Sequence, residues 1–328
     1  MSKTFDYKDI NLIPKLCVVK SRSECSTKVS LGRFVFELPV VPANMECVID
    51  QTLAENLASE NYFYILHRFN VDVKAFMVRM KKLNLFTSIS VGVTEESYRL
   101  LDELIVENLI PDFITIDIAH GHSLTVRDMI YFIRNSIPNK KVFIICGNVS
   151  TPEAVRDLID WGADCIKVGI GPGSACTTYP TTGFGSRDIQ GYCVEQCSKT
   201  ARVSGIPVIA DGGISSTSDI AKALVLGATF VMIGGMLSGF KDSPGNIIKV
   251  DGKLYKEFYG SASSHSYTSD GKKKIKNIEG VRKIIPYKEE SVLKYYEHIK
   301  ECLQSSISYG GGNNLNALKG VKYVVKTN

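Results

Sequence analysis

Cys176 is the residue whose surroundings most favour chemistry. It ends a glycine-rich turn, Gly169-Ile-Gly-Pro-Gly-Ser-Ala-Cys176, which directly follows the apolar run Cys165–Gly169. Glycines let backbone N–H and C=O groups approach a ligand or ion closely, so this turn presents the thiol. Thr178 stands two residues later, where its hydroxyl can reach a group bonded to the sulfur. An unpaired cysteine taken alone is more often a small core residue, so the loop around Cys176 carries the prediction of covalent catalysis.

Two more loops contain glycine pairs that suit an anion. Gly212 and Gly213 end the run Pro207–Gly213, and Gly234 and Gly235 end the run Phe230–Gly235. In β/α barrels the loops after strands seven and eight bind phosphate through backbone N–H groups. Tight turn packing is the alternative explanation of these glycines. Asp211 can accept two hydroxyl hydrogen bonds, as a ribose would offer.

The elements that must position these residues follow a repeating pattern. Helical patterns lie between runs rich in β-branched and aromatic residues, with a cap and first-turn proline at Thr151-Pro152 and an apolar face in Ser216–Leu226. This alternation predicts a parallel sheet, closed as a (β/α)8 TIM barrel. An open doubly wound sheet would want a Gly-x-Gly-x-x-Gly after the first strand, and the chain has none there. The eight expected strands are Val40–Met45, Tyr62–His67, Phe86–Gly92, Phe113–Ala119, Lys141–Val149, Cys165–Gly171, Pro207–Gly213 and Phe230–Gly235.

The polar residues that close these runs should share one face. Barrel chemistry lies on the loops after the carboxyl ends of the strands, so we expect all of them at one mouth. They are Asn44-Met45, His67-Arg68, Asp117 to His122, Gly147-Asn148, Cys176, Asp211-Gly-Gly and Gly234-Gly235.

Composition limits the class of protein. The 328 residues, 44% apolar and 22% charged, suit one large α/β domain, and we predict a single barrel over residues 1–328. A net charge of +5 gives no nucleic-acid footprint, and a phosphorylated small substrate would explain it. The N-terminus has no apolar signal region, and glycines interrupt the stretch Leu224–Phe240, so we expect no membrane partner.

The nine cysteines are spaced too widely for a disulfide scaffold. We therefore expect a reducing, cytoplasmic location. The closest pair, Cys193 and Cys197, has no second ligand pair as zinc would need, so we interpret it as structural.

The cysteine loop closely resembles that of the IMP dehydrogenase and GMP reductase family, whose motif is Gly-Pro-Gly-Ser-x-Cys-Thr-Thr. Every fixed position matches in Gly171–Thr178. Ile209–Ile214 resembles the family's ribose and phosphate segment, and Ile233–Gly239 resembles its second phosphate loop. The N-terminal Phe5–Pro14 also looks familiar, so the resemblance covers essentially the whole chain.

Within the family the chain looks like the GMP reductase branch. It has no room for the paired CBS motifs of IMP dehydrogenases, and residues 241–290 contain no Arg-Tyr pair to activate water. Leu254–Ser263 and Asn277–Gly280 are similar to GMP reductases, and Glu279 matches their catalytic glutamate. Read alone, Glu279 is a solvated loop charge. We expect a flap over about residues 254–286 and a C-terminal tail over 303–328.

This resemblance implies NADPH-dependent reductive deamination of GMP to IMP and ammonia. Cys176 would attack C2 of the purine, with Thr178 and Glu279 as the proton relay on a mobile cysteine loop. The residues implied for substrate are Ser174, Asp211, Gly213, Gly234, Gly235, Ser261 and Ser263. Those implied for the cofactor are Asp117, Ala119, Gly121 and Lys276, and the backbone carbonyls of Gly171, Gly173 and Cys176 match a monovalent cation site for K+.

Several readings stay open at this point. The histidine-rich turn after Asp117 can be a capped strand end, and the run Lys272–Lys276 can be a solvated flap. An IMP dehydrogenase without its regulatory domain, or a nucleotide-binding regulator without turnover, are the alternative functions. Tyr179-Pro180 stands where the family more often has Arg or Lys. Barrels of this family are usually tetramers, which makes a homotetramer the expected assembly.

Overall fold

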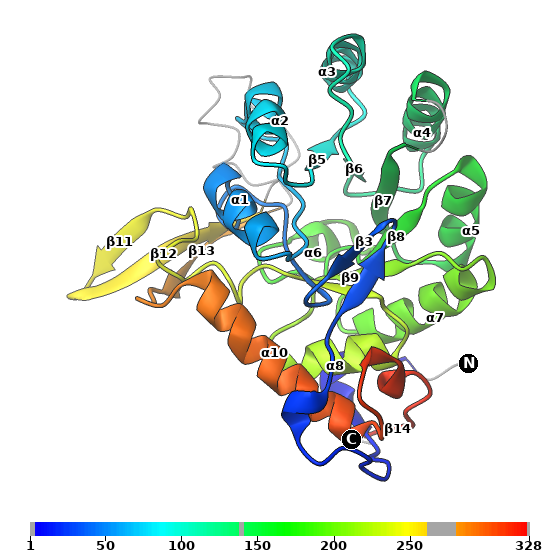
Figure 1. Cartoon of the computed structure of the whole chain (residues 1–328), viewed down its shortest axis with the longest axis vertical. Helices are drawn as coiled ribbons and strands as arrows, with labels where there is room; N and C mark the ends of the chain where they lie inside the picture. The colour runs from blue at the N-terminus through cyan, green and yellow to red at the C-terminus, as the bar shows by residue number, and fades with distance from the viewer. Residues whose placement is uncertain (1–3, 138–140, 261–279, 327–328) are drawn as a thin grey trace.

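The computed structural model describes residues 4–137, 141–260 and 280–326. Its centre is a curled sheet of seven parallel strands in the order β4-β10-β9-β8-β7-β6-β5, and in Figure 1 helices lie around the outside of these strands. The fold is TIM-barrel-like. The strands are β4 (Val40–Pro42), β5 (Ser88–Val91), β6 (Phe113–Asp117), β7 (Phe143–Val149), β8 (Cys165–Val168), β9 (Val208–Asp211) and β10 (Phe230–Ile233).

Seven of the eight expected strands are therefore present, and the prediction for Tyr62–His67 was wrong. That segment is fully buried and lies along β5, where the Leu66 N–H donates to the Ser88 carbonyl at 3.2 Å. Side chains replace the regular ladder, because the Ser90 hydroxyl donates to the Leu66 carbonyl at 2.7 Å and the Tyr64 hydroxyl donates to that of Phe86 at 3.0 Å. The segment thus lies where the missing barrel strand was expected, but it does not pair as a strand.

The helices begin and end where capping residues stand. The Thr151 hydroxyl accepts a hydrogen bond from Ala154 N–H, Pro152 occupies the first turn, and Gly162 ends helix α5 with φ of 111°. The other α-helices are α1 (Gln51–Ser59), α2 (Val73–Lys82), α3 (Glu95–Val106), α4 (Leu124–Ser136), α6 (Thr178–Thr182), α7 (Gln190–Val203), α8 (Thr217–Val225) and α10 (Val292–Tyr309), with α5 at Pro152–Trp161.

Two segments named in the sequence can be placed in the fold. Leu224–Phe240 contains the end of α8, strand β10 and a loop, and no helix among the described residues is long and apolar enough to cross a membrane. Cys193 and Cys197 are both buried in α7. Across the described parts of the chain, no group of three or more His, Cys, Asp or Glu side chains could hold a metal ion.

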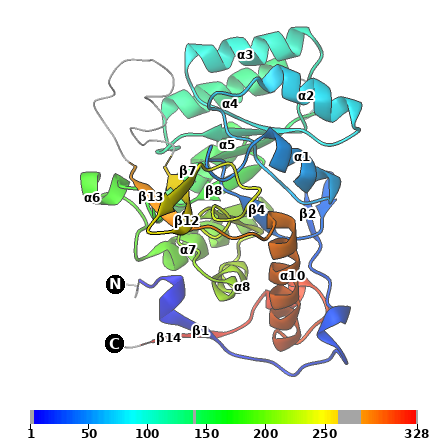
Figure 2. The same cartoon turned by 90° about the vertical axis from the view of Figure 1, so that its left-hand side faces the viewer.

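Short antiparallel sheets complete the fold. Strand β1 (Ile10–Leu12) pairs with β14 (Tyr323–Val325), which places the two ends of the chain side by side in Figure 2. Strands β2 (Val29–Leu31) and β3 (Phe34–Phe36) form a hairpin. A three-stranded sheet, here called the flap sheet, follows the order β11-β12-β13. Its strands are β11 (Ile247–Val250), β12 (Lys253–Tyr259) and β13 (Arg282–Pro286).

The amino ends of the barrel strands are filled by aromatic rings. Phe113 and Phe230 each begin a strand, and the ring of Phe63 lies 5.0 Å from Phe113 and 5.4 Å from Phe230. Phe36 of the β2–β3 hairpin adds a ring 5.0 Å from Phe63. This end of the barrel serves stability, and the opposite end is left for chemistry.

Candidate functional site

The cysteine loop leaves strand β8 through a glycine that no other residue can replace. Gly169 has φ of 146°, and a Cβ there would lie 1.9 Å from the Asp211 carbonyl oxygen. The loop then turns back so that the Cys176 N–H donates to the Gly173 carbonyl at 3.0 Å. Cys176 is partly exposed, and its Sγ lies 3.2 Å from the hydroxyl of Thr178, the first residue of α6. The Thr178 hydroxyl is therefore near enough to reach a group bonded to the sulfur, as the spacing predicted.

The flap sheet lies against this loop. The Val281 N–H donates to the Ala175 carbonyl at 2.9 Å, and Cys176 and Gly280 form an isolated antiparallel bridge. A Cβ on Gly260 would lie 3.2 Å from the Ala175 oxygen and 3.4 Å from the Cα of Gly280. The end of β12 and the start of β13 thus meet at the backbone of the cysteine loop. The predicted residues Ser261, Ser263, Lys276 and Glu279 lie outside the described residues.

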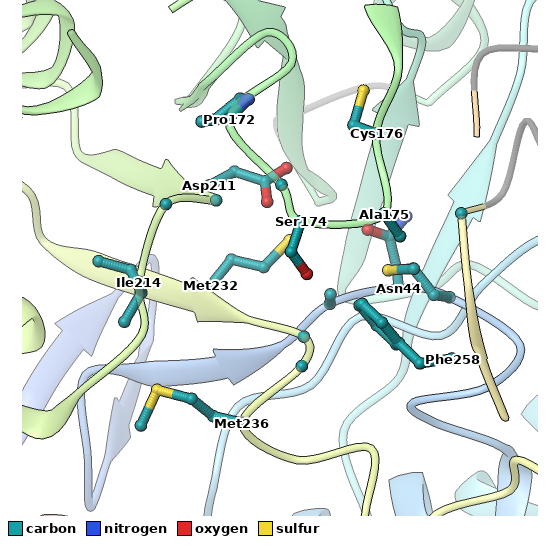
Figure 3. Close-up of a pocket in the computed structure, with 18 of the residues that line it drawn as sticks. Asn44, Pro172, Ser174, Ala175, Cys176, Asp211, Ile214, Met232, Met236 and Phe258 are labelled. Carbon is teal, nitrogen blue, oxygen red and sulfur yellow. The ribbon is translucent and has the colours of Figure 1, made fainter. Parts of the chain in front are cut away.

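A cavity of about 840 Å³ opens where the strands end. Residues from the loops after β4, β6, β9 and β10 line it together with Asn148 near the end of β7 and the cysteine loop, which confirms that these strand ends share one mouth. Figure 3 shows Asp211, Ser174 and Phe258 around one space, with Cys176 on the loop beside it. The predicted residues that line it are Asp117, Ala119, Gly173, Ser174, Cys176, Thr178, Asp211, Gly213, Gly234 and Gly235.

Two predicted glycines do not line this cavity. Gly121 supports its wall, because its N–H donates to the Asn148 carbonyl at 2.7 Å. Gly171 has φ of 78° and lies against the start of α6, where a Cβ would be 3.4 Å from the Tyr179 nitrogen. Both glycines therefore shape loops of the site.

One end of the cavity has the character of an anion site. Gly213, with φ of 77°, and Ser215 line it from the loop after β9, and Gly234 and Gly235 line it from the loop after β10. The loop after β9 is fixed by Asp219 of α8, whose Oδ2 accepts from the Ser215 N–H at 3.1 Å and the Ser215 hydroxyl at 3.0 Å. Backbone N–H groups beside a helix N-terminus favour negative charge, so this end suits a phosphate.

A buried lysine forms the floor of the cavity. The Lys167 Nζ lies 3.0 Å from Asp117 Oδ1 and 2.9 Å from Asp211 Oδ2. Burial alone lowers the pKa of Lys167, but the two carboxylates outweigh burial and raise this pKa above its ordinary value. Burial alone raises the pKa of Asp117, and the Lys167 ammonium, helped by Arg68, overcomes it and lowers that pKa. Lys167 therefore stays protonated and carries a positive charge.

Asn148 and Arg68 were expected at this mouth without a role of their own, and both line the cavity, whereas Lys167 was not expected there. The signal for Lys167 was a lysine inside an otherwise apolar strand. The Asn148 amide donates to Asp211 Oδ2 at 2.8 Å, and Arg68 lines the cavity next to Phe69. The neighbouring His67 is neutral at pH 7, since burial lowers its pKa to about 4.

A partly exposed thiol beside glycine loops that suit a phosphate, both at the carboxyl ends of barrel strands, is typical of barrel enzymes that act on phosphorylated small molecules. Comparison with known proteins identifies the group more closely. The sequence profile described as the IMP dehydrogenase / GMP reductase domain matches residues 3–328. The chain belongs to the IMP dehydrogenase / GMP reductase family.

Similar proteins named GMP reductase cover the chain over nearly its full length. One from Lactobacillus delbrueckii subsp. bulgaricus is 49% identical over 327 residues, which is 99% of this chain and 96% of the relative. One from Mycoplasma mycoides subsp. mycoides is 49% identical over 323 residues, or 98% of each chain. One from Bacillus licheniformis is 50% identical over 329 residues, covering 100% of this chain and 98% of the relative.

Proposed function

We propose that this protein is a GMP reductase, which converts GMP to IMP and ammonia with NADPH as reductant and serves purine nucleotide salvage. The observation that carries the proposal is the 3.2 Å contact between Cys176 Sγ and Thr178 Oγ1 at a cavity whose other end suits a phosphate. The full-length similarity to proteins named GMP reductase supports it.

The chemistry begins with the thiol. The Cys176 sulfur attacks C2 of guanine, and the bond from C2 to the exocyclic nitrogen breaks as the new C–S bond forms. The departing amine takes up a proton and leaves as ammonia. In the relay that we propose, the Thr178 hydroxyl, which lies 3.2 Å from the sulfur, carries the proton and Glu279 is its partner. NADPH, when bound, supplies the hydride that forms the new C2–H bond. The C–S bond then breaks, which releases IMP and returns the thiolate.

In this proposal the substrate binds the cavity in one direction. With the purine at Cys176, the phosphate reaches the glycine loops after β9 and β10 at the other end. Asp211 lies between these ends as the acceptor for ribose hydroxyls, and Ser174 points into the same space in Figure 3. In this proposal Ser261 and Ser263 contact the guanine.

The cofactor side is assigned to Asp117, Ala119, Gly121 and Lys276. A structural feature that fits a further ligand here is the side-chain oxygen of Asn148, which is buried and has no hydrogen-bond partner among the described residues. Asn148 lines the cavity and its amide is already bound to Asp211, so its oxygen can accept from an amide or hydroxyl of a ligand. Such donors are present in a nicotinamide riboside.

We assign the cation site to the backbone carbonyls of Gly171, Gly173 and Cys176. A hard cation such as K+ takes oxygen ligands, and the turns of this loop expose carbonyls. The Gly173 carbonyl accepts one hydrogen bond from Cys176, and a carbonyl oxygen has a second lone pair for an ion. A bound ion would hold the cysteine loop in place.

The proposed setting is a homotetramer in the cytoplasm. All nine cysteines are free thiols, which suits a reducing compartment. The assembly rests on the family resemblance and is tested by sedimentation of the purified protein.

The decisive assay mixes the purified protein with GMP, NADPH and a potassium salt, and follows NADPH loss together with ammonia release. Ammonia and NADP+ are expected to form in equal amounts. If neither forms but IMP with NAD+ yields NADH and XMP, the protein is an IMP dehydrogenase instead. Silence in both assays, with GMP still bound, would identify a nucleotide-binding regulator.

Replacing the proposed nucleophile tests the covalent step. Cys176→Ala should abolish turnover and leave the dissociation constant of GMP within a few-fold, because the phosphate and ribose contacts lie elsewhere in the cavity. Calorimetry gives the binding and the coupled assay gives the turnover. Normal steady-state rates in this variant would refute a role for the thiol.

A further inference from the structure

Lys167 connects two parts of the cavity that lie on different strands. It belongs to β8 and is only 2% exposed, yet its ammonium reaches both Asp117 at the end of β6 and Asp211 at the end of β9. Strand β7 lies between β6 and β8. The lysine must therefore cross a whole strand to reach Asp117.

Gly147 makes this crossing possible. In the sheet register, Asp117 is paired with Gly147 on β7, and Gly147 is paired with Lys167 on β8. A Cβ on Gly147 would lie 2.7 Å from the Cβ of Lys167 and 2.5 Å from its carbonyl oxygen. The residue between the two charged partners has no side chain, and the lysine uses the space that a side chain would fill.

Hydrogen bonds join the Lys167 ammonium to its neighbours. Lys167 is held by two carboxylates, and Asp211 is in turn held by the Asn148 amide at 2.8 Å. Removing the lysine would leave two buried carboxylates together without their cation, and one of them would then take up a proton. The lysine, the two carboxylates and Asn148 thus form one connected unit, in which a change at one carboxylate reaches the other through the ammonium.

We propose that Lys167 is a positioning residue that couples nucleotide binding to cofactor binding. This inference rests on the proposed function, in which Asp211 receives the ribose of the nucleotide and Asp117 lies on the cofactor side. A nucleotide that fixes Asp211 also fixes the shared ammonium, and the ammonium fixes Asp117. The second ligand then binds to a carboxylate that the first ligand has already ordered. Each ligand therefore strengthens the binding of the other by the same factor.

The experiment measures this factor with ligands that do not react together. Calorimetry gives the dissociation constant of IMP without NADPH and with saturating NADPH. Couplings between sites are typically about 5- to 150-fold, and we expect at least about fivefold in the native protein. In Lys167→Met the factor should fall to within about twofold of unity.

Two further variants keep the outcome interpretable. Asp117→Asn preserves shape and leaves the Lys167–Asp211 pair, so IMP alone should bind as in the native protein while the coupling is reduced. Lys256→Met is the matched control: Lys256 is another lysine only 3% exposed, but its ammonium contacts the backbone carbonyls of Lys241 and Ser243. It should lower thermal stability and retain the native coupling.

Each result has a defined meaning. If Lys167→Met does not fold, Asp117→Asn decides the question alone. Native coupling in a folded Lys167→Met or in Asp117→Asn would overturn the inference, and so would loss of coupling in Lys256→Met. If the native protein binds both ligands without coupling, the inference fails and the proposed function stands. If it binds neither IMP nor NADPH, the proposed function fails as well.

Discussion

Thr178→Val is the sharpest test of the proton relay. Valine has nearly the shape of threonine and lacks the hydroxyl that lies 3.2 Å from Cys176 Sγ. Positioned proton donors contribute about 10²- to 10⁴-fold to a rate. Since each tenfold change corresponds to about 1.4 kcal/mol, the expected loss of transition-state stabilisation is about 2.7 to 5.4 kcal/mol.

The same substitution should cost the fold almost nothing. Thr178 is partly exposed at the start of a five-residue helix, and such surface changes usually stay within about 0.5 kcal/mol. We therefore expect kcat to fall by about 10²- to 10⁴-fold while the dissociation constant of GMP stays within a few-fold. Single-turnover measurement of ammonia release separates the two effects.

Thr181→Val is the matched control for this experiment. Thr181 lies on the same helix and is exposed, so its replacement has the same effect on helix propensity without reaching the thiol. It should keep the native kcat. A Thr178→Val protein with kcat within threefold of native would refute the relay, and a large rise in the GMP dissociation constant with native kcat would make Thr178 a binding residue.

Two other substitutions probe the two ends of the cavity. Gly121→Ala would put a Cβ 2.7 Å from the carbonyl carbon of Gly147, and overpacking of this kind costs about 1 to 3 kcal/mol. If this cost falls on the cofactor side, the KM for NADPH should rise about 5- to 150-fold with little change in GMP binding. Lys288→Met removes an ammonium that lines the cavity and stands 4.4 Å from the ring centre of Phe240. Exposed charges contribute up to about 1 kcal/mol, so the KM for GMP should rise about fivefold at low salt and less at high salt. Lys283→Met is the control and should leave the KM for GMP unchanged at both salt concentrations. Steady-state kinetics in both substrates checks each result.

Most of the barrel could be predicted because its signals are local. An apolar run followed by a cap and an amphipathic helix identifies each β/α unit, as at Thr151 and Ser216, where both helices begin as predicted. The positions of the site residues follow from the same pattern, since parallel strands bring their carboxyl ends to one edge. This is why the sequence alone predicts that Asp117, Cys176 and Asp211 lie at the same end of the barrel.

The parts that could not be predicted depend on contacts distant in sequence. Strand β1 pairs with β14 some three hundred positions later, and nothing within either three-residue run identifies its partner. The segment Tyr62–His67 has the composition of a buried strand, but side-chain hydroxyls replace a regular ladder. The Ser90 hydroxyl donates to the Leu66 carbonyl, and the Tyr64 hydroxyl of the segment donates to the Phe86 carbonyl. Lys167 looked like a single interruption of an apolar strand because its two partners belong to other strands.

The departure from the family pattern at Tyr179-Pro180 falls on the outer side of the cysteine loop. Cys176 and Thr178 line the cavity, whereas Tyr179 is 43% exposed and belongs to the next position of α6. A side chain that points outward there cannot take part in the proton transfer that we propose between the Cys176 sulfur and the Thr178 hydroxyl. The tyrosine at this position therefore leaves the contact between the Cys176 sulfur and the Thr178 hydroxyl unchanged.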